Sequence, residues 1–479
     1  MHKDAIRIEP VPSKLTSNIL TFFLWALLMT GCARFQPLPL SPAHNAAELD
    51  SRSLTNNALK SFLEKNLQRD LSQWPPVEWD FEMLALAAFY YHPSLEVARA
   101  QWAVAKGGEM TASQRPNPTV SVAPAYNTTT AMVSPWLVVS SLDVPIETAG
   151  KRRYRRAHAA RLSEAARLNI VSVAWQVRST LRSNLLDLTA AEHRDTMLRN
   201  QVAFQEKIVQ RQQQLVEAGA IAGSEFLPFR ITLQKARLDL ADAQRLRADA
   251  RGRVAEAIGI PLRALDQAKL AFDLRREPIS TSELTTDGVR RTALQGRADI
   301  LEALAEYAAA QAALQLEIAK QYPDFHLQPG YEFDQGDSKW SLGISLELPV
   351  FSRNQGPIAE AKAKRVEAAA RFNALQAKVL AEIDRSVESF RITETNAATL
   401  RSLADAQAKR RDAVAAQLKA GAADQVDLLN AEFESATYEL VALDNQIKLQ
   451  QALGALEDAI QRPLALPEAI FRSQRSDAR

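Results

Sequence analysis

Few residues in this chain have the types and spacing that catalysis or metal binding requires. The six histidines are His2, His44, His92, His158, His193 and His326. None stands in an HExxH pair or another metal-ligand spacing, and no EF-hand loop occurs. No Ser-His-Asp or Cys-His group, phosphate-binding loop or suitable carboxylate pair stands out. The sequence therefore predicts a protein that is not an enzyme and that needs no cofactor or bound metal, with histidines in structural or surface positions.

One residue with chemistry of its own remains, the single cysteine Cys32. A lone cysteine excludes an intramolecular disulfide framework and a cysteine zinc cluster. It follows ILTFFLWALLM, residues 19–29, a run too short to span a bilayer as a helix, which takes about 20 residues. The run is typical of a signal-peptide core, and Thr30-Gly31-Cys32 resembles the end of a bacterial lipoprotein signal. The resemblance implies a fatty-acylated (palmitate) Cys32 as the mature N-terminus and sorting to the outer membrane. An ordinary signal with a chance cysteine is the alternative.

The balance of charge gives no support to a nucleic-acid partner. The formal net charge is +2 over 479 residues, and both signs are mixed along the chain. A basic run, KRRYRR at 151–156, stands where a strand is expected to give way to a helix. Attraction to lipid head groups or a solvated helix start explains this run better than nucleic acid does. Asp143 and Glu147 lie close by and either line a lumen or are ordinary solvated acids.

Two stretches have the two-residue period of β-strands. In FHLQPGYEFDQGDSKWSLGISLELP, apolar side chains alternate with small or polar ones along two arms, and Asp334–Lys339 reads as the polar turn. These patterns predict β-hairpins at about 118–145 and about 323–349. Each outgoing arm carries a proline, Pro124 or Pro329, which predicts a bulge or a bend because proline has no N–H for the ladder.

Long helices are expected over most of the remaining chain. Residues 151–218 and 358–420 contain no glycine or proline. At ~1.5 Å per residue each would form a rod roughly 95 to 100 Å long, whereas ordinary helices average about 11 to 12 residues. Each rod ends at a glycine, Gly219 or Gly421, where positive φ lets a helix stop. Apolar residues at three- and four-residue steps predict coiled-coil packing of the rods.

The two halves of the chain repeat each other. A shift of 202 residues places Gly219 on Gly421 and Pro261 on Pro463, and a shift of 205 places Tyr126 on Tyr331. We therefore predict a tandem duplication in which each copy is a helix, a hairpin, a long helix, a turn and a helix. The expected division is a signal peptide at 1–31, a linker region at 32–80, repeat 1 at 81–262, a connector at 263–282, repeat 2 at 283–464 and a polar tail at 465–479.

The hairpins set the expectation for the membrane. No stretch after the signal reaches 18 consecutive apolar residues, so a crossing must use strands. Four strands cannot close a barrel, because the smallest membrane barrels have about 8, and an open sheet edge in lipid leaves backbone groups unpaired. The hairpins therefore either lie in water or are pooled by several chains. Strand length and the aromatic residues near the turns favour pooling, with interfacial roles expected for Tyr126, Trp136, Tyr331, Phe333 and Trp340.

Two motifs at the hairpin–rod junctions complete the pattern: VPIETAGKRR at 144–153 and LPVFSRNQG at 348–356. With the hairpins and the duplicated rods, they make the chain resemble the TolC-like family of outer-membrane efflux proteins, and most of all its cobalt-zinc-cadmium resistance branch. The resemblance implies a mainly α fold with membrane β-strands. In such a tandem-duplicated TolC-like fold, a long periplasmic α-helical barrel is joined to four β-strands per chain that contribute to a trimeric twelve-stranded barrel.

The same resemblance implies a function. A homotrimer, lipid-anchored in the outer membrane, would passively conduct divalent heavy-metal cations from an inner-membrane resistance-nodulation-division pump and a periplasmic adaptor (membrane fusion protein) to the exterior. The adaptor is expected to contact the turns at the rod ends, where Ser224 and Asp424 are the expected N-caps; the tip residues are Leu215, Gly219, Ser224, Leu418, Gly421 and Asp424. A TolC-like duct for drugs or type I protein secretion, and a periplasmic coiled-coil scaffold lipoprotein, are the alternatives.

Overall fold

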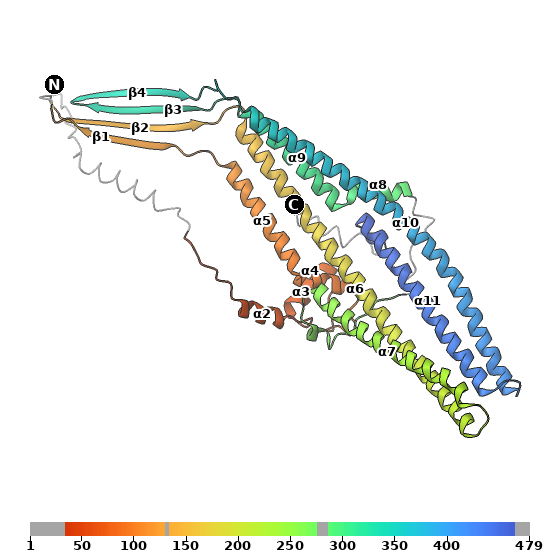
Figure 1. Ribbon diagram of the computed structural model, residues 1–479. Helices are drawn as coiled ribbons and strands as arrows, with labels where there is room; N and C mark the ends of the chain where they lie inside the picture. The colour runs from red at the N-terminus through yellow and green to blue at the C-terminus, as the bar shows by residue number, and fades with distance from the viewer. Residues whose placement is uncertain (1–33, 130–133, 275–285, 465–479) are drawn as a thin grey trace, which may run out of the picture. The chain divides into compact units, whose positions relative to one another are not determined.

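The computed structural model describes residues 34–129, 134–274 and 286–464, which divide into two units after Ser51. The described part of the first unit contains helix α2 (Pro42–Ser51), which has no buried residue. All other described elements belong to the second unit (Figure 1). The expected signal peptide, Cys32 and the polar tail lie outside the described residues.

Most helices of the second unit occur twice, once in each repeat. Their bounds are α3 (Asn57–Leu67), α4 (Phe81–Tyr91), α5 (Pro93–Ser113), α6 (Lys151–Glu217), α7 (Gly223–Ile258), α8 (Thr286–Gly296), α9 (Ala298–Ala319), α10 (Gln355–Lys419) and α11 (Gln425–Ile460), with a 3₁₀ turn, η1 (Leu262–Leu265). A shift of 205 carries α4 onto α8, and a shift of 202 carries α7 onto α11, end for end. The predicted tandem duplication is confirmed.

Helices α6 and α10 are the predicted rods. They contain 67 and 65 residues, which corresponds to about 100 Å each at 1.5 Å per residue. Their sequences are rich in Ala, Leu, Glu, Arg and Gln, the residues with the highest helix propensity. Within the part of the chain that the structure describes, no helix is both long enough and apolar enough to cross a bilayer.

The four strands form one antiparallel sheet in the order β1-β2-β3-β4. The strands are β1 (Thr119–Tyr126), β2 (Trp136–Ile146), β3 (Phe325–Asp334) and β4 (Asp337–Leu346). The central pairing of β2 with β3 joins the hairpins of the two repeats. The turn between β3 and β4 is shorter than predicted, because Asp334 still pairs with Asp337. Only Gln335 and Gly336 lie between them, with φ of 51° and 122°, and a two-residue turn of this kind matches the strand twist.

The prediction of bulges at the two prolines is wrong. The register of β1 against β2 passes Pro124 without a shift, and that of β3 against β4 passes Pro329 in the same way. Pro124 lies on an edge strand, where no N–H is needed on the outer side. Opposite Pro329, the β2–β3 pairing stops after Ser141 and resumes at Val144. The missing N–H interrupts the ladder locally without inserting a residue.

Each repeat has its own hydrophobic core. In the first, α6 contributes buried Val177, Leu181, Leu185 and Leu188, which pack with α4 and α7. In the second, α10 contributes Val379, Ile383, Val387 and Phe390, which pack with α11. These two sets correspond one to one at the shift of 202, so the repeat that the sequence shows is also a repeat of packing.

Each layer of the second unit places four elements side by side. The sheet has the order given above, and Figure 1 shows its strands next to the start of α6 and α10. In the helical part nearer the sheet the helices follow the order α5-α6-α9-α10. In the part nearer the rod ends, which we call the lower helices, the order is α7-α6-α11-α10. In every layer the two inner elements come from different repeats, and one element of each repeat is left at an edge.

Candidate conduit surface and its junctions

The sheet has one apolar face. Strand alternation and the pairing register place the side chains of every second residue together. Apart from Ser140 and Ser338, that face carries Val120, Val122, Pro124, Tyr126, Trp136, Val138, Leu142, Val144, Ile146, Phe325, Leu327, Pro329, Tyr331, Phe333, Trp340, Leu342, Ile344 and Leu346. Several are strongly exposed, with Trp340 at 83%, Leu342 at 68% and Ile344 at 67%. An apolar surface of this extent is unusual on a soluble monomer and is typical of an interaction or membrane surface.

Aromatic pairs lie on the apolar face near the hairpin turns. Tyr126 stands opposite Trp136 with ring centroids 5.1 Å apart, and Tyr331 stands opposite Trp340 at 4.9 Å. Phe333 lies two residues nearer the turn on the same face and is half-buried. The structure thus brings together the five aromatic residues expected at an interface, in two equivalent cross-strand pairs plus Phe333.

The opposite face of the sheet is polar and mainly acidic. Near its base His326 Nδ1 lies 2.9 Å from an Asp143 carboxylate oxygen. Near the turn Lys339 Nζ lies 2.6 Å from Asp334 and 4.0 Å from Glu332. The remaining described positions on this face are mostly Ser, Thr, Gln, Gly and Ala. Asp143 therefore belongs to the polar side, which fits either alternative, a lumen-lining acid or an ordinary solvated one.

A buried lysine fastens the first strand–rod junction to the second hairpin. Lys151 Nζ lies 2.8 Å from Asp324 Oδ1, and the Thr148 backbone N–H donates to the same oxygen at 2.7 Å. Burial alone would raise the pKa of Asp324, but the bonds from Lys151 and Thr148 outweigh burial and hold its pKa below the usual value. This cluster ties residues that are far apart in the sequence and come from different repeats.

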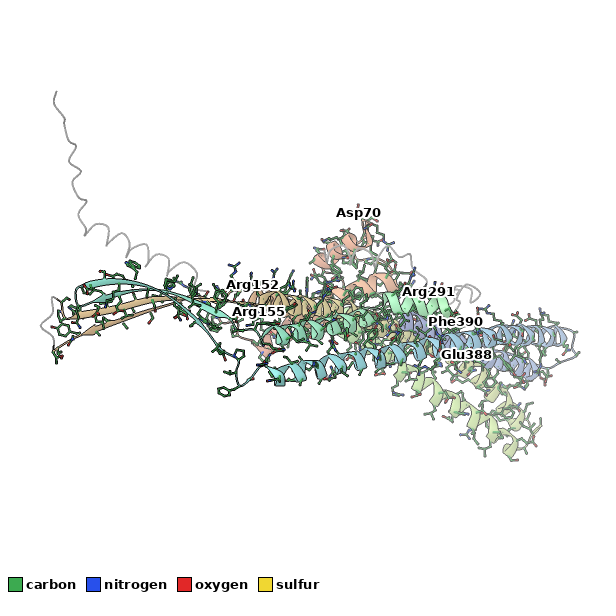
Figure 2. The ribbon with its side chains drawn as sticks, turned by 90° about the horizontal axis from the view of Figure 1, so that it is seen from above. Asp70, Arg152, Arg155, Arg291, Glu388 and Phe390 are labelled. Atoms are coloured by element: carbon green, nitrogen blue, oxygen red, sulfur yellow. The ribbon has the colours of Figure 1, made fainter. Side chains whose placement is uncertain are left out.

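The basic run has a structural role that the sequence did not reveal. Figure 2 shows Arg152 and Arg155 where the strands meet the helices. Arg152 Nε donates to the Ser113 carbonyl at 2.8 Å, and Arg155 donates to the Ala112 carbonyl at 3.0 Å and to both oxygens of Glu147. The bond with Glu147 raises the pKa of Arg155. These arginines satisfy carbonyls at the C-terminal end of α5, a role that the interpretation of the run as head-group contacts or a solvated helix start did not include.

The second junction has an equivalent but smaller clamp. Asn354, with φ of 61°, precedes α10 as Gly150, with φ of 72°, precedes α6. Its side-chain amide donates to the Glu317 carbonyl at 2.8 Å and to the Glu317 carboxylate at 2.9 Å. Each long helix is therefore hydrogen-bonded at its start to the end of the shorter helix beside it.

The turns at the rod ends share one geometry. Gly219 and Gly421 have φ of 71° and 73°. The N–H of the next residue reaches back to the fifth residue before it, Ala220 to Leu215 and Ala422 to Gln417, each at 2.8 Å. This is the Schellman C-cap, which satisfies carbonyls that a helix end leaves open. Leu215 and Leu418 are half-buried at these tips.

The predicted caps of the return helices are half right. Asp424 is the N-cap of α11 and forms a capping box with Asp427, with both bonds present. Ser224 is not a cap, because α7 begins at Gly223 and its N-cap position is Ala222, which makes no side-chain bond. The fixed spacing of three residues from the tip glycine sets the start of the helix in both repeats, and repeat 1 has an alanine at that place.

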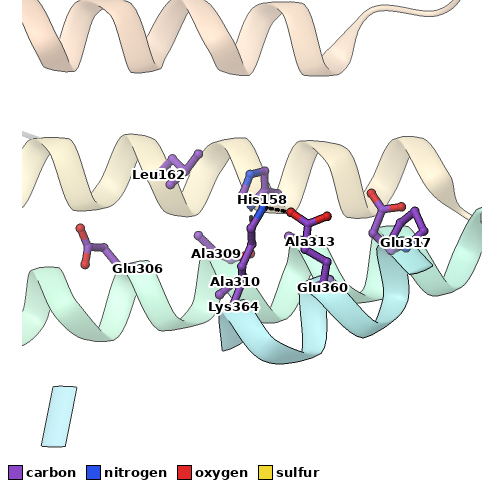
Figure 3. Close-up of a pocket in the computed structure, with 11 residues that line it drawn as sticks. His158, Leu162, Glu306, Ala309, Ala310, Ala313, Glu317, Glu360 and Lys364 are labelled. Carbon is purple, nitrogen blue, oxygen red and sulfur yellow. Dashed lines mark hydrogen bonds and ion pairs between the residues drawn. The ribbon is translucent and has the colours of Figure 1, made fainter. Parts of the chain in front are cut away.

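A cavity of ≈ 450 Å³ lies among α6, α9 and α10. Figure 3 shows the residues that line it, His158 and Leu162 of α6, Glu306 and Glu317 of α9, and the Glu360–Lys364 pair of α10. His158 Nδ1 lies 2.9 Å from the Ala309 carbonyl, and Lys364 Nζ lies 2.6 Å from Glu360. Across the described residues, no group of three or more His, Cys, Asp or Glu side chains is arranged to hold a metal ion.

The duplicated rods, the two hairpins paired in one sheet and the two faces of that sheet define a TolC-like chain. A family model described as "Outer membrane efflux protein" matches residues 88–260 and 289–460, once in each repeat. The chain belongs to this family of outer-membrane efflux proteins, whose members here are channel proteins.

Individual relatives agree with that assignment. The chain is 24% identical over 345 residues to the cobalt-zinc-cadmium resistance protein CzcC of Cupriavidus metallidurans, covering 71% of this chain and 79% of that one. The fold is similar to the outer-membrane channel OprN, with a TM-score of 0.67, 18% identity and coverage of 91% and 99%. It is also similar to the outer membrane protein VceC of Vibrio cholerae, with a TM-score of 0.65, 17% identity and coverage of 80% and 96%.

The two faces of β4 predict opposite responses to a buried charge. Leu342→Arg places a charge on the apolar face at mid-strand, and we expect it to lower the free energy of unfolding in lipid vesicles by about 2 to 4 kcal/mol. Ser341→Arg, one residue away on the polar face, is the matched control and should change it little. Equal effects of the two substitutions would contradict a lipid-facing apolar side.

The junction at Asp324 predicts a dependence on pH. Because the folded-state pKa of Asp324 is lowered, its contribution to stability is present above the unfolded value of about 3.9 and is lost as pH falls through the folded value. We expect Asp324→Asn to lower stability at neutral pH by about 1 to 3 kcal/mol and to flatten the acid limb of thermal melts recorded against pH. Asp239→Asn, at an exposed position on α7, is the control. An unchanged acid limb in Asp324→Asn would show that another group controls it.

Proposed function

We propose that this chain is the outer-membrane exit duct of a tripartite efflux system and works as a homotrimer. The observation that carries the proposal is the two-faced sheet with free outer edges on β1 and β4 within the described residues. An apolar face belongs in lipid, but in lipid each unpaired backbone group costs several kcal/mol. Further copies of the chain can cover those edges, and three copies supply twelve strands, more than the ~8 that a barrel needs.

The helical layers support the same assembly. In each layer the edge elements come from different repeats, β1 and β4 in the sheet and α7 and α10 among the lower helices. Two different edges that meet head to tail generate a ring when the rotation closes. Strand and helix layers would then close together, with the polar sheet face turned inward as the wall of a conduit.

Conduction in such a duct would be passive. The inner-membrane pump, expected to be of the resistance-nodulation-division type, supplies the driving force. The periplasmic adaptor would meet the exposed tips around Gly219 and Gly421, on the resemblance to the family. The Schellman turns give each tip a short turn of defined backbone conformation, to which an adaptor helix could bind.

Divalent heavy-metal cations are the proposed cargo. The name of the relative CzcC refers to resistance to cobalt, zinc and cadmium. The polar face of the sheet carries more acidic than basic side chains. The acidic ones are Asp143, Glu332, Asp334 and Asp337, and the others are Lys339 and His326. Three copies would turn these acids into rings, the arrangement that cation-conducting pores use. A duct for drugs or secreted polypeptide is the alternative within transport.

Loss of the chain predicts a metal phenotype. Cells of the source bacterium without this chain should become more sensitive to cobalt, zinc or cadmium salts and should accumulate the ion, because its exit route is closed. Growth on graded salts, with total metal measured in washed cells, checks this, and restoration by the wild-type chain is the control.

The alternatives give different results in the same cells. Unchanged metal tolerance with raised sensitivity to dyes or antibiotics would support a drug duct. Loss of a secreted polypeptide would support type I secretion. A chain that fractionates with soluble periplasmic proteins would point to the coiled-coil scaffold and against any duct.

Lipid anchoring at Cys32 is a separate part of the proposal. Cells fed a labelled palmitate analogue should label the wild-type chain and leave Cys32→Ser unlabelled, because the thiol is the acyl acceptor. Equal labelling of both chains would contradict acylation at Cys32. The barrel can hold the variant in the outer membrane, so membrane fractionation alone does not test this point.

A further inference from the structure

The contact between the repeats within one chain is built along the antiparallel helices α6 and α11, which we call the α6–α11 seam. Buried Arg178 bonds Glu457, and Trp175 and Ser179 both bond Asp458. One turn along, Arg182 donates to the Gln450 carbonyl at 2.9 Å. Beyond that, Leu186 and Ala190 of α6 pack with Leu443 and Ile447 of α11 in one buried cluster.

The duplication supplies a second copy of each side of this seam. At the shift of 202, α10 is the counterpart of α6 and α7 is the counterpart of α11. In the single chain several positions on these counterpart faces are exposed. Ile392 is 53% exposed where its counterpart Ala190 is 4% exposed. Arg245 and Ala248 are exposed where Ile447 and Gln450 are buried.

We infer that α10 of one copy packs against α7 of a second copy in the register of the α6–α11 seam, with Glu388 paired to Arg245 and Ile392 packed on Ala241. The occupant of both exposed faces is thus another molecule of this chain. The inference rests on the proposed homotrimer and adds to it the residues that form the intersubunit contact.

The charges at the counterpart positions change in complementary ways. Because α6 and α11 are antiparallel and Arg182 bonds Gln450, Leu186 lies level with Ile447. In the proposed contact this apolar pair becomes Glu388 with Arg245, an acid against a base. The counterpart of buried Arg178 is the apolar Leu380, which is half-buried, and the counterpart of Glu457 is Ala255, which packs in the core of repeat 1. Independent drift at two unrelated surfaces would not be expected to place an acid and a base at the same level.

The volumes at the next level change in the same compensating way. Small Ala190 lies level with large Leu443 in the α6–α11 seam. In the proposed contact the large residue is Ile392 on α10, and the small one is Ala241 on α7. A large side chain against a small one is kept, with the two sides exchanged, as close packing between helices requires.

A glycine supports the register at the level of Arg182, one turn before Leu186. A Cβ on Gly454 would collide with the Arg182 guanidinium, which would then have to shift. Its counterpart Gly252 has nothing within 4 Å in the single chain. On α10 the counterpart of Arg182 is Asp384, which binds Arg290 with both carboxylate oxygens at 2.6 and 2.7 Å. Gly252 of the second copy leaves room for this guanidinium, as Gly454 does for Arg182.

Charge exchange tests the proposed ion pair. In the single chain Glu388 pairs with Arg391 and Arg245 pairs with Asp242, both at exposed sites. Glu388→Arg and Arg245→Glu should each weaken the trimer, seen as a tenfold or greater rise in the protein concentration at which purified detergent-solubilised protein dissociates. The chain carrying both substitutions should recover most of the loss. The double change does not repair either local pair, so recovery must come from contact between copies.

The control for charge is Arg385→Glu on α10. Its counterpart Ser183 remains exposed even though α6 is flanked on both sides, so this reversal should leave the dissociation concentration unchanged. Unchanged helix content in circular dichroism must accompany every variant. No recovery in the double variant would overturn the pairing of Glu388 with Arg245.

Crosslinking tests the register of α10 against α7 of the second copy directly. A chain with Ile392→Cys and Ala241→Cys should give covalent dimers and trimers under mild oxidation, whereas each single variant should not. Ala398→Cys with Ala241→Cys is the matched control, because the counterpart of Ala398, Thr196, stays exposed. Trimers without this crosslink would overturn the register and leave the duct intact. A chain that never leaves the monomer would overturn both proposals.

Discussion

Backbone hydrogen bonding at the sheet edges is the constraint on which the rest of this structure depends. The strands are held by their neighbours on the inside, and β1 and β4 each present an outer edge without a partner among the described residues. In water such edges invite uncontrolled pairing, and in lipid they are not tolerated. In the proposed ring the repeat would resolve the problem for all layers at once, because closing the sheet head to tail would also bring the edge helices of neighbouring copies together.

The junctions explain how the open sheet and the long rods could be closed by one rotation between copies. Lys151 with Asp324 joins the start of α6 to the second hairpin, and Arg155 holds the end of α5. Asn354 repeats this at the start of α10. With these bonds, the position of each strand relative to its rod is fixed inside the chain, so that a rotation between copies carries strands and helices by the same amount.

The sequence alone predicted those features that depend on local chemistry. The absence of glycine and proline over long stretches predicted the rods, and Gly219 and Gly421 predicted where the rods end. The alternation of apolar and polar residues predicted the hairpins. The misses depend on contacts between distant segments. Arg152 and Arg155 could not be assigned before α5 was placed beside α6, and Ser224 was chosen as a cap by residue type when the repeat spacing fixed Ala222. The shift of 202 was in the sequence and would have corrected that choice. The predicted length of the turn around Gln335 and Gly336 was too great. Asp334 and Asp337 are polar, which is typical of a loop, but they form the last residue pair of the β3–β4 ladder.

The α6–α11 seam and the proposed contact between copies carry their charges differently. The reason is that the α6–α11 seam is always covered within one chain, whereas the other surface is exposed to water before assembly. Arg178 and Glu457 are each 3% exposed, and a pair of that kind is strongly destabilising if one partner is left buried alone. Inside one chain both partners are always present, so the pair is never stranded. A contact between copies has to survive as a free surface before assembly, and there Glu388 and Arg245 remain solvated and bound to helix neighbours. At the proposed contact Leu380 stands where Arg178 stands in the α6–α11 seam, and an apolar side chain leaves no uncompensated charge when the partner is absent.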